Sequence, residues 1–168
     1  MEIEEVVKTY TIYLLKLSYL YVKDKQIAED IVQEVFLKFY KNQAAYQEEG
    51  KIKQYLTVMT VNQCKDYVKS WAYRKVIIKE KLTRSHVETA AMILKEERQT
   101  IANAVLALPI KYREPIIFYY YEERNILEIA ELLHLSDNTV KTRLREARRR
   151  LHHVLATDDW EVLQIEEQ

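Results

Sequence analysis

Apolar residues recur every three or four positions along most of this chain, which is the spacing that places them on one side of an α-helix. Such stripes run from about Ile3 to Val22 and from Asp24 to about Lys41. In the second of these segments, the residues expected to be buried are Ala28, Ile31, Val32, Val35, Phe36 and Phe39. The chain contains one glycine and two prolines, so few positions favour a break in the helices. The pattern therefore predicts an all-α protein with short connections.

The segment from Asn125 to Leu151 is the most informative part of this pattern, because it predicts two helices joined by a tight turn. Asn125 and Glu128 have the spacing of a capping box, and Ser136 can cap the second helix. The apolar stripe of the second helix consists of Val140, Leu144, Ala147 and Leu151. A short helix, a sharp turn and a basic helix are typical of a helix-turn-helix unit, whose second helix enters the DNA major groove.

The face of this helix opposite the apolar stripe carries side chains suited to DNA. Arg and Asn can form paired hydrogen bonds with guanine and adenine, and Lys or Arg can neutralise phosphate. The candidate DNA-binding residues are Asn138, Thr139, Lys141, Thr142, Arg143, Arg145 and Arg149. The charged residues that flank this face are Lys141, Arg143, Glu146, Arg148 and Arg150. The alternative is that the face is solvated and contacts no DNA.

Charge is unevenly distributed along the chain, although the formal net charge is zero. The segment from Lys141 to Arg150 has six basic residues and one acidic residue, whereas Ala156 to Gln168 has five acidic residues and no Lys or Arg. A neutral chain with a local basic segment is consistent with DNA binding that also requires a second partner. The acidic tail either folds back onto the basic helix or extends as a frayed terminus, and the sequence leaves both interpretations open.

The helix predicted after Asp24 has an outer face of a different kind. Asp30, Gln33 and Glu34 lie on this face, and Leu37 lies among them. A large apolar side chain within an acidic surface is suited to docking a partner whose surface is basic. We therefore interpret these four residues as a protein-binding surface.

A loop from about Asn42 to Gly50 separates this helix from a long one, predicted between about Lys51 and Arg74. Aromatic and basic side chains alternate along the long helix, namely Tyr55, Lys65, Tyr67, Lys69, Trp71, Tyr73 and Arg74. Single-stranded bases can stack on aromatic rings while lysines follow the phosphate backbone. The alternative is that these rings belong to an ordinary helical core.

A weakly patterned segment at residues 76–98 is interpreted as a linker that leads into the second helical unit. Pro109 then opens another predicted helix, which continues through Tyr120. Pro115 lies inside this helix, where it removes one backbone hydrogen bond and is expected to bend the helix.

The cysteine and histidine content argues against a disulfide framework or a metal site. Cys64 is the only cysteine, and the four histidines lack the spacing of metal ligands. A glycine-rich phosphate-binding loop is also absent from the sequence. We therefore predict no catalytic residue, no metal and no cofactor. The chain has no stretch apolar enough to span a bilayer and no signal peptide, so we expect a cytoplasmic protein without membrane insertion.

Three segments, in this order, carry a resemblance to a known family: AEDIVQEVFLKFYKN, YLTVMTVNQCKDYVKS and LPIKYREPIIFYYYEERNILEIAELLHLSDNTVKTRLREARRRL. Over roughly residues 5–155, the chain resembles bacterial sigma factors of the sigma-70 family, in the small extracytoplasmic-function (ECF) group. The resemblance implies two small helical domains joined by a linker, with the helix-turn-helix in the second. The divisions it implies are residues 1–75 for a region 2-like domain, 76–98 for the linker, 99–155 for a region 4-like domain and 156–168 for the acidic tail.

The resemblance also implies a function without catalysis, in which the protein directs RNA polymerase core to promoters and initiates transcription. The first domain would bind the clamp helices of the polymerase and melt the −10 element. The second would contact the polymerase flap and read the −35 element. The family's core-binding motif is matched by Asp30, Gln33, Glu34 and Phe36, and Leu37 lies beside them. An anti-sigma factor is a further candidate partner.

The first domain also supplies residues for the −10 element. Asn62 and Asp66 match the asparagine and aspartate of the family's strand-separating helix. The loop before that helix corresponds to the one that holds a flipped −10 base, and Asn42 and Tyr46 are the candidates to line it. The complete set of candidate −10 residues is Asn42, Tyr46, Asn62, Lys65, Asp66 and Lys69.

The chain departs from the family pattern at several positions. They are Tyr55 in place of Trp, Val61 in place of Arg, and His134 and Glu123 in place of glycine. Glu146 stands where the recognition helix usually has Arg. A carboxylate cannot replace Arg at guanine or phosphate, although it can accept a hydrogen bond from a cytosine amino group. Either the −35 sequence differs from the common one, or Arg145 takes over the contact.

Two other classes of protein account for part of the sequence. A stand-alone helix-turn-helix transcriptional regulator accounts for the segment from Asn125 to Leu151, but leaves the acidic face around Leu37 unexplained. A helical interaction protein accounts for the neutral charge, but not for the polar face of the basic helix. A regulator binds its duplex unaided, whereas a sigma factor requires polymerase, so DNA binding by the isolated chain discriminates between them.

Overall fold

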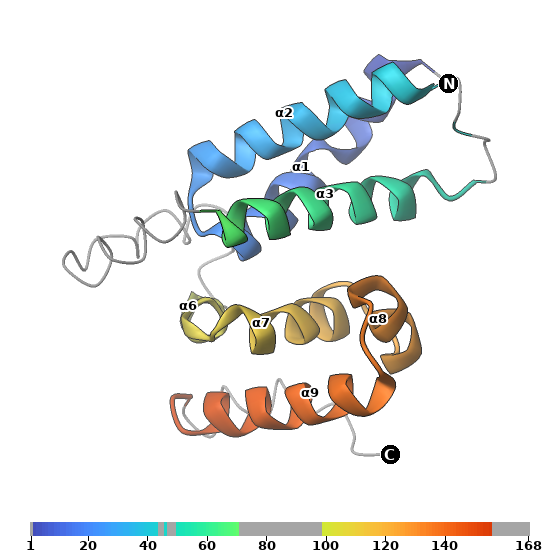
Figure 1. Ribbon diagram of the computed structural model, residues 1–168. Helices are drawn as coiled ribbons and strands as arrows, with labels where there is room; N and C mark the ends of the chain where they lie inside the picture. Colours follow the sequence, from blue (N-terminus) through green and yellow to red (C-terminus); the bar gives the residue numbers. More distant parts are fainter. Residues whose placement is uncertain (1, 44–45, 47–49, 71–98, 156–168) are drawn as a thin grey trace. The chain divides into compact units, whose positions relative to one another are not determined.

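A computed structural model describes residues 2–43, 46, 50–70 and 99–155 of the chain. The described residues form α-helices and one π-helical segment, and they include no β-strand (Figure 1). This confirms the predicted all-α fold class. The chain divides into two compact units, Met1–His86 and Val87–Gln168. The predicted linker and the acidic tail lie outside the described residues.

The first unit contains three helices, α1 (Ile3–Val22), α2 (Lys25–Asn42) and α3 (Ile52–Lys69), and each packs on the other two. Lys23 ends α1 in the left-handed conformation, with a φ of 60°. The Asp24 side chain then caps α2 by accepting a hydrogen bond of 3.0 Å from the Ile27 N–H. This short connection lets α2 fold back along α1 (Figure 1).

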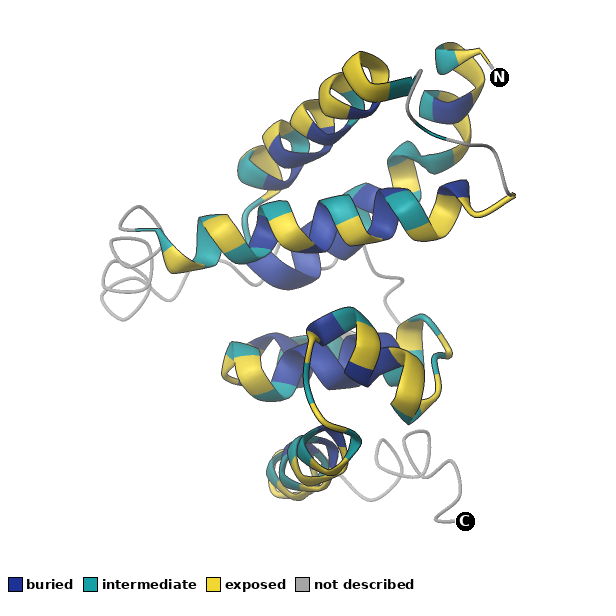
Figure 2. Cartoon of the chain, turned by 45° about the vertical axis from the view of Figure 1, so that its right-hand side comes forward, coloured by how far each residue is buried: buried dark blue, intermediate teal, exposed yellow. Residues whose placement is uncertain are grey.

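The buried faces of these three helices meet in one core (Figure 2). On α2 the buried residues are Ala28, Ile31, Val32, Val35 and Phe39. Phe36 was also predicted to be buried in this stripe, but it is only half-buried. It lies at the edge of the stripe, where the neighbouring helices cover it only in part.

Two predicted boundaries in the first unit are corrected by the structure. Asn42 is the last residue of α2 and not part of the loop, because nothing in the sequence breaks the helix before the Gln43 N–H closes the final turn on the Tyr40 carbonyl. The third helix ends at Lys69, earlier than the expected Arg74, because Ser70 has an extended backbone with a ψ of 160°.

The second unit contains α6 (Gln99–Ala107), α7 (Ile110–Ile116), the π-helix η3 (Ile117–Tyr121), α8 (Ile126–Leu133) and α9 (Asp137–His152). Helix α7 packs on α6 and α9, and α8 packs on η3 and α9. Arg113 is almost fully buried in α7, and its guanidinium donates a hydrogen bond of 2.7 Å to the Leu106 carbonyl. This bond secures the end of α6 against α7.

The helix predicted from Pro109 through Tyr120 changes its hydrogen-bonding pattern after Pro115. Proline has no N–H to donate to the carbonyl four residues earlier, so it interrupts the regular ladder. The following residues form the π-helix, and the Glu122 N–H closes it by donating to the Ile117 carbonyl at 3.2 Å. The expected irregularity is therefore present as a wider helical turn.

Candidate nucleic-acid and protein-binding surfaces

The helix-turn-helix is fixed by two helix caps that were predicted from the sequence. The Glu128 N–H donates to Asn125 Oδ1 at 3.0 Å, and the Asn125 N–H donates to Glu128 Oε2 at 2.8 Å, which completes a capping box. Ser136 Oγ accepts a hydrogen bond of 3.1 Å from the Thr139 N–H and caps α9. These caps satisfy N–H groups that helix starts leave without an intrahelical partner.

The turn between α8 and α9 passes through His134, which has a left-handed backbone with a φ of 54° and a ψ of 49°. Glu123, just before α8, is also left-handed, with a φ of 52°. Glycine adopts this conformation without steric cost, whereas other residues adopt it with strain. His134 and Glu123 stand where the family usually has glycine, and both adopt the backbone conformation that favours glycine.

The apolar stripe of α9 is fully buried, because Val140, Leu144, Ala147 and Leu151 are each no more than 2% exposed. The exposed candidate residues are Asn138, Thr142, Arg145 and Arg149 on the opposite face, and Lys141 at its flank. Thr139 and Arg143 are half-buried, and the Thr139 hydroxyl shares a hydrogen bond of 2.8 Å with Ser136 Oγ. We call the five exposed residues the α9 outer face.

Two arginines of α9 lie against tyrosines of α7 and η3. Arg148 Nε donates a hydrogen bond of 2.8 Å to the Tyr120 hydroxyl, and its guanidinium lies 5.2 Å from the centroid of the Tyr119 ring. The Arg150 guanidinium lies 4.7 Å from the centroid of the Tyr112 ring. Both contacts are cation–π interactions that connect α9 to the rest of the unit.

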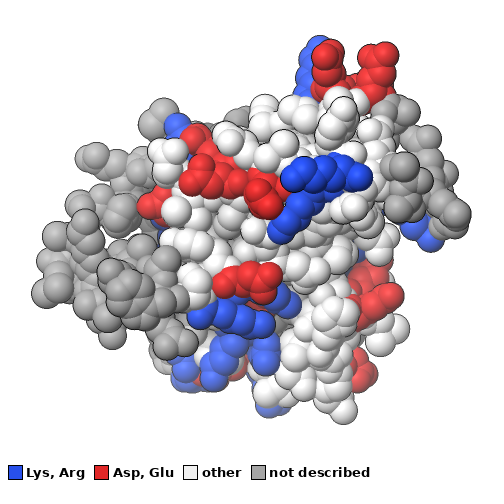
Figure 3. Space-filling view, turned by 45° about the horizontal axis from the view of Figure 1, so that its top comes forward, with Lys and Arg blue, Asp and Glu red and all other residues white. Residues whose placement is uncertain are grey.

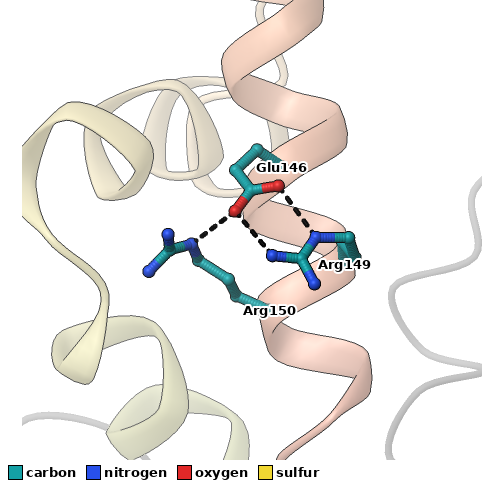
Figure 4. A network of polar contacts seen from close by, with 3 residues as sticks. All are labelled: Glu146, Arg149 and Arg150. Carbon is teal, nitrogen blue, oxygen red and sulfur yellow. Dashed lines mark hydrogen bonds and ion pairs between the residues drawn. The ribbon is translucent and has the colours of Figure 1, made fainter.

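Glu146 forms the centre of a charged network on α9 (Figure 4). Its two carboxylate oxygens accept hydrogen bonds from Arg149 Nε at 2.8 Å and from Arg149 Nη2 at 2.9 Å. Arg150 Nε donates a third bond of 2.8 Å to the same carboxylate. The hydrogen bonds from Arg149 and Arg150 lower the pKa of Glu146 to about 2, so it is charged throughout the physiological range. Sequence reasoning missed this network, although spacings of three and four residues place side chains together on a helix.

The α2 candidates all lie on the surface of the first unit. Asp30, Gln33 and Glu34 are exposed, and Leu37 is 54% exposed. Tyr40, one turn further along α2, is 60% exposed and was not predicted. Its position three residues after Leu37 was a usable signal. Acidic side chains gather on this part of the first unit, with basic side chains beside them (Figure 3). We call Asp30, Gln33, Glu34, Leu37 and Tyr40 the α2 surface.

A second strip of exposed residues follows α3. Asn62, Asp66 and Lys69 are exposed at spacings of four and three residues, so they share one side of the helix, and Lys65 is half-buried beside them. Val58 precedes them at the same spacing and is 36% exposed. We call these five residues the α3 surface, of which Val58 was not predicted.

The two candidates for the flipped base lie in different environments. Asn42 is exposed at the end of α2, whereas Tyr46 packs against aromatic rings of the first unit. The Tyr46 ring centroid lies 5.0 Å from that of Tyr55 and 5.8 Å from that of Phe39. The Tyr55 ring also contacts Phe39, so the structure supports a core role for Tyr55. The expected contributions of residues 71–75 lie outside the described residues.

The second unit also has an open groove of about 640 Å³ where η3 meets α8. Its lining includes Tyr119, Tyr120, Arg124 and Leu127, and Leu127 is 70% exposed. Within the described residues, no group of three His, Cys, Asp or Glu side chains is placed to hold a metal ion. None of the described helices is both long and apolar enough to cross a membrane.

Comparisons with known proteins match both units. Residues 6–74 match the family model described as sigma-70 region 2, and residues 98–151 match that described as sigma-70, region 4. The chain is 29% identical over 154 residues to ECF RNA polymerase sigma factor SigM of Bacillus subtilis, covering 90% of this chain and 93% of that protein. It is also 29% identical over 163 residues to ECF RNA polymerase sigma factor SigW of the same organism, covering 90% and 87%.

The fold is also similar to that of a solved structure. This is the sigma factor RpoE in complex with the anti-sigma factor NepR from Bartonella quintana, with a TM-score of 0.60 and 18% sequence identity. The similarity covers 98% of each chain. At this level of identity it supports the helical architecture alone.

Proposed function

The chain belongs to the sigma-70 family, in its extracytoplasmic-function group, so it directs RNA polymerase core to promoters, and we propose that three separate surfaces carry out this function. Those surfaces are the α2 surface, the α3 surface and the α9 outer face. No catalytic residue, metal or cofactor has a part in the proposal. Since transcription takes place in the bacterial cytoplasm, that is the proposed location.

The α2 surface is assigned to the clamp helices of the polymerase. Its carboxylates steer a basic partner, and Leu37 and Tyr40 supply exposed apolar area for the centre of the contact. Lys38 lies beside the α2 surface and links it to α3. Its Nζ lies 3.6 Å from a Glu34 carboxylate oxygen and donates a hydrogen bond of 2.7 Å to Gln63 Oε1 on α3.

The α3 surface is assigned to the −10 element, together with Asn42 and Tyr46. Asn62 and Asp66 provide polar groups for separated bases, and Lys65 and Lys69 provide charge for the phosphate backbone. Tyr46 packs on Phe39 and Tyr55, so its proposed role is to line one wall of the pocket for the flipped −10 base.

The α9 outer face is assigned to the major groove of the −35 element. Asn138, Thr142, Arg145 and Arg149 project from the side opposite the buried stripe, which is the side that a recognition helix presents to base edges. The groove at Leu127 is assigned to the polymerase flap, because its exposed apolar side chains are suited to an apolar partner. An anti-sigma factor that covers these surfaces is the proposed inhibitor.

The observation that carries the proposal is that the α2 surface and the α9 outer face lie in units that match regions 2 and 4 of one family, in the family's order. The test is to mix the purified chain with core polymerase and a promoter library and to sequence the transcripts. We expect initiation at a restricted set of promoters with common −10 and −35 elements. A stand-alone regulator would instead bind one duplex specifically without polymerase and would start no transcript.

A further inference from the structure

Arg149 is held by Glu146 through one edge of its guanidinium. The two hydrogen bonds use Nε and Nη2, so both carboxylate oxygens are engaged along the side of the group (Figure 4). A guanidinium is planar and rigid, and its donors point outward in a fixed fork. Fixing one edge therefore fixes the direction of the other edge, which carries the remaining donors of Nη1 and Nη2.

The other partners of the network keep Glu146 in position. Arg150 Nε donates to Oε1 of the same carboxylate at 2.8 Å, while the Arg150 guanidinium packs on the Tyr112 ring of α7. The Glu146 side chain is 26% exposed, compared with 59% for Arg149. The carboxylate is thus attached to the unit's own packing, and the arginine that it holds remains open to a ligand.

We propose that Glu146 is a positioning residue that aligns Arg149 so that the free end of its guanidinium reads a guanine in the −35 element. The end-on pair of N–H groups matches the O6 and N7 acceptors that guanine presents in the major groove. This inference rests on the proposed function of the α9 outer face. In this inference Glu146, which stands where the family usually has Arg, supports the contact of Arg149 with DNA.

Arg145 provides the comparison within the same helix. It is exposed, and among the described residues it makes no ion pair. Its side chain must therefore lose more rotational freedom when it binds a base, whereas Arg149 is already aligned in the free protein. Positioning by Glu146 predicts that the base read by Arg149 is discriminated more strongly than the base read by Arg145.

The experiment measures promoter preference of the reconstituted holoenzyme on a library in which every base pair of the −35 element is varied. Arg149→Ala should lose the preference for guanine at one position, by about 5- to 150-fold, the range for a paired contact. Glu146→Gln and Glu146→Asp should reduce the preference at that same position. Glu146→Asp keeps the charge but shortens the side chain, so its effect reports on position alone. The double variant Glu146→Gln with Arg149→Ala should behave as Arg149→Ala.

Glu131→Gln is the matched control, because it changes the net charge equally from an exposed site on α8. It should leave the preference at every −35 base pair unchanged. The proposal is overturned if Arg149→Ala alters no base preference, or if the Glu146 variants retain the guanine preference. It is also overturned if they alter a different base pair, because Glu146 would then read a base itself.

A measurement on the free chain separates this inference from the proposed function. In a ¹⁵N NMR spectrum, the Arg149 Nε–H signal should be protected from exchange with water in the wild type and lose that protection in Glu146→Gln. The Glu146→Gln variant can lose this protection while the wild-type holoenzyme starts no transcript at promoters. That result would contradict the proposed function, but it would still support the Glu146–Arg149 network. An unprotected Arg149 Nε–H in the wild type would overturn the positioning of Arg149.

Discussion

Helices α2 and α9 are built on the same plan but use their exposed charges differently. Each buries one apolar stripe in its own unit and presents a polar face. On α2 the acidic side chains lie around exposed Leu37 and Tyr40. On α9, Arg148 and Arg150 contact tyrosines of α7 and η3, and Arg149 contacts Glu146.

The difference follows from the length of the side chains. Arginine can lay its stem along apolar surface and reach a neighbouring helix with its charged end, whereas aspartate and glutamate are too short to do so. On α2 the Glu34 carboxylate pairs with Lys38 at 3.6 Å, but both side chains remain exposed. On α9 a count of charged residues overestimates the charge that is open to DNA.

The largest expected effect tests the α2 side of this comparison. Asp30→Arg combined with Glu34→Arg should abolish formation of the holoenzyme, because like charges brought together at an interface cost several kcal/mol, roughly. Co-purification with core polymerase measures the loss, and circular dichroism should show unchanged helicity. Glu4→Arg with Glu5→Arg, on exposed positions of α1, makes the same charge change and should still co-purify. If the α2 variant still co-purifies with core polymerase, the α2 surface does not bind the polymerase.

The next effect tests which residues of α9 face the bases. Thr142→Ala and Arg149→Ala should each weaken recognition of the −35 element by about 1–3 kcal/mol, the cost of a lost base contact. Lys141→Ala should instead weaken binding to all sequences alike and reduce its salt dependence, as expected for a phosphate contact. Competition between matched and scrambled −35 duplexes on the holoenzyme measures both. If the three variants behave alike, the outer face contacts only phosphate.

A smaller effect separates inward from outward arginines. Arg148→Ala should lower the free energy of unfolding by about 1–2 kcal/mol, because it removes a hydrogen bond to Tyr120 and a cation–π contact. Arg145→Ala, from an exposed position that makes no such contact with the described residues, should change the free energy of unfolding by less than about 0.5 kcal/mol. Urea titration followed by circular dichroism compares the two. Equal stability of both variants would mean that the Arg148–Tyr120 contact does not hold α9.

The smallest effect concerns the turn that sets the angle between α8 and α9. His134→Gly should raise the free energy of unfolding by about 0.5 kcal/mol, because relief of left-handed strain exceeds the entropy that glycine adds to the unfolded chain. The same urea titration measures it, and the −35 preference should not change. A less stable His134→Gly variant would show that the His134 side chain contributes contacts that outweigh the strain.

The local features of this fold were predictable because they depend on neighbours in sequence. Asp24, Asn125 and Ser136 cap helices through side chains that bond backbone three residues away, so the sequence contains the whole interaction. The buried stripe of α9 was predictable for the same reason, since its period is that of the helix. The all-α class followed from these elements.

Features that join distant segments were not predictable in this way. The contact of Arg148 with Tyr120 spans 28 residues, and the packing of Tyr46 on Phe39 and Tyr55 depends on how α2 and α3 meet. The half-burial of Phe36 likewise depends on the neighbours of α2. The Glu146 network is different, because its partners lie three and four residues away and the spacing alone could have indicated it.

The two arginines held on tyrosines limit how this protein can be retargeted to a new promoter. Thr142, Arg145 and Arg149 can be exchanged while Arg148 and Arg150 continue to attach α9 to the tyrosines below it. A transplanted recognition helix without arginine at position 148 or 150 would lose the contact with Tyr120 or with Tyr112. Engineers of orthogonal gene circuits should therefore rewrite the outward positions of α9 one by one and retain its inward arginines, and natural divergence of promoter specificity is expected to follow the same path.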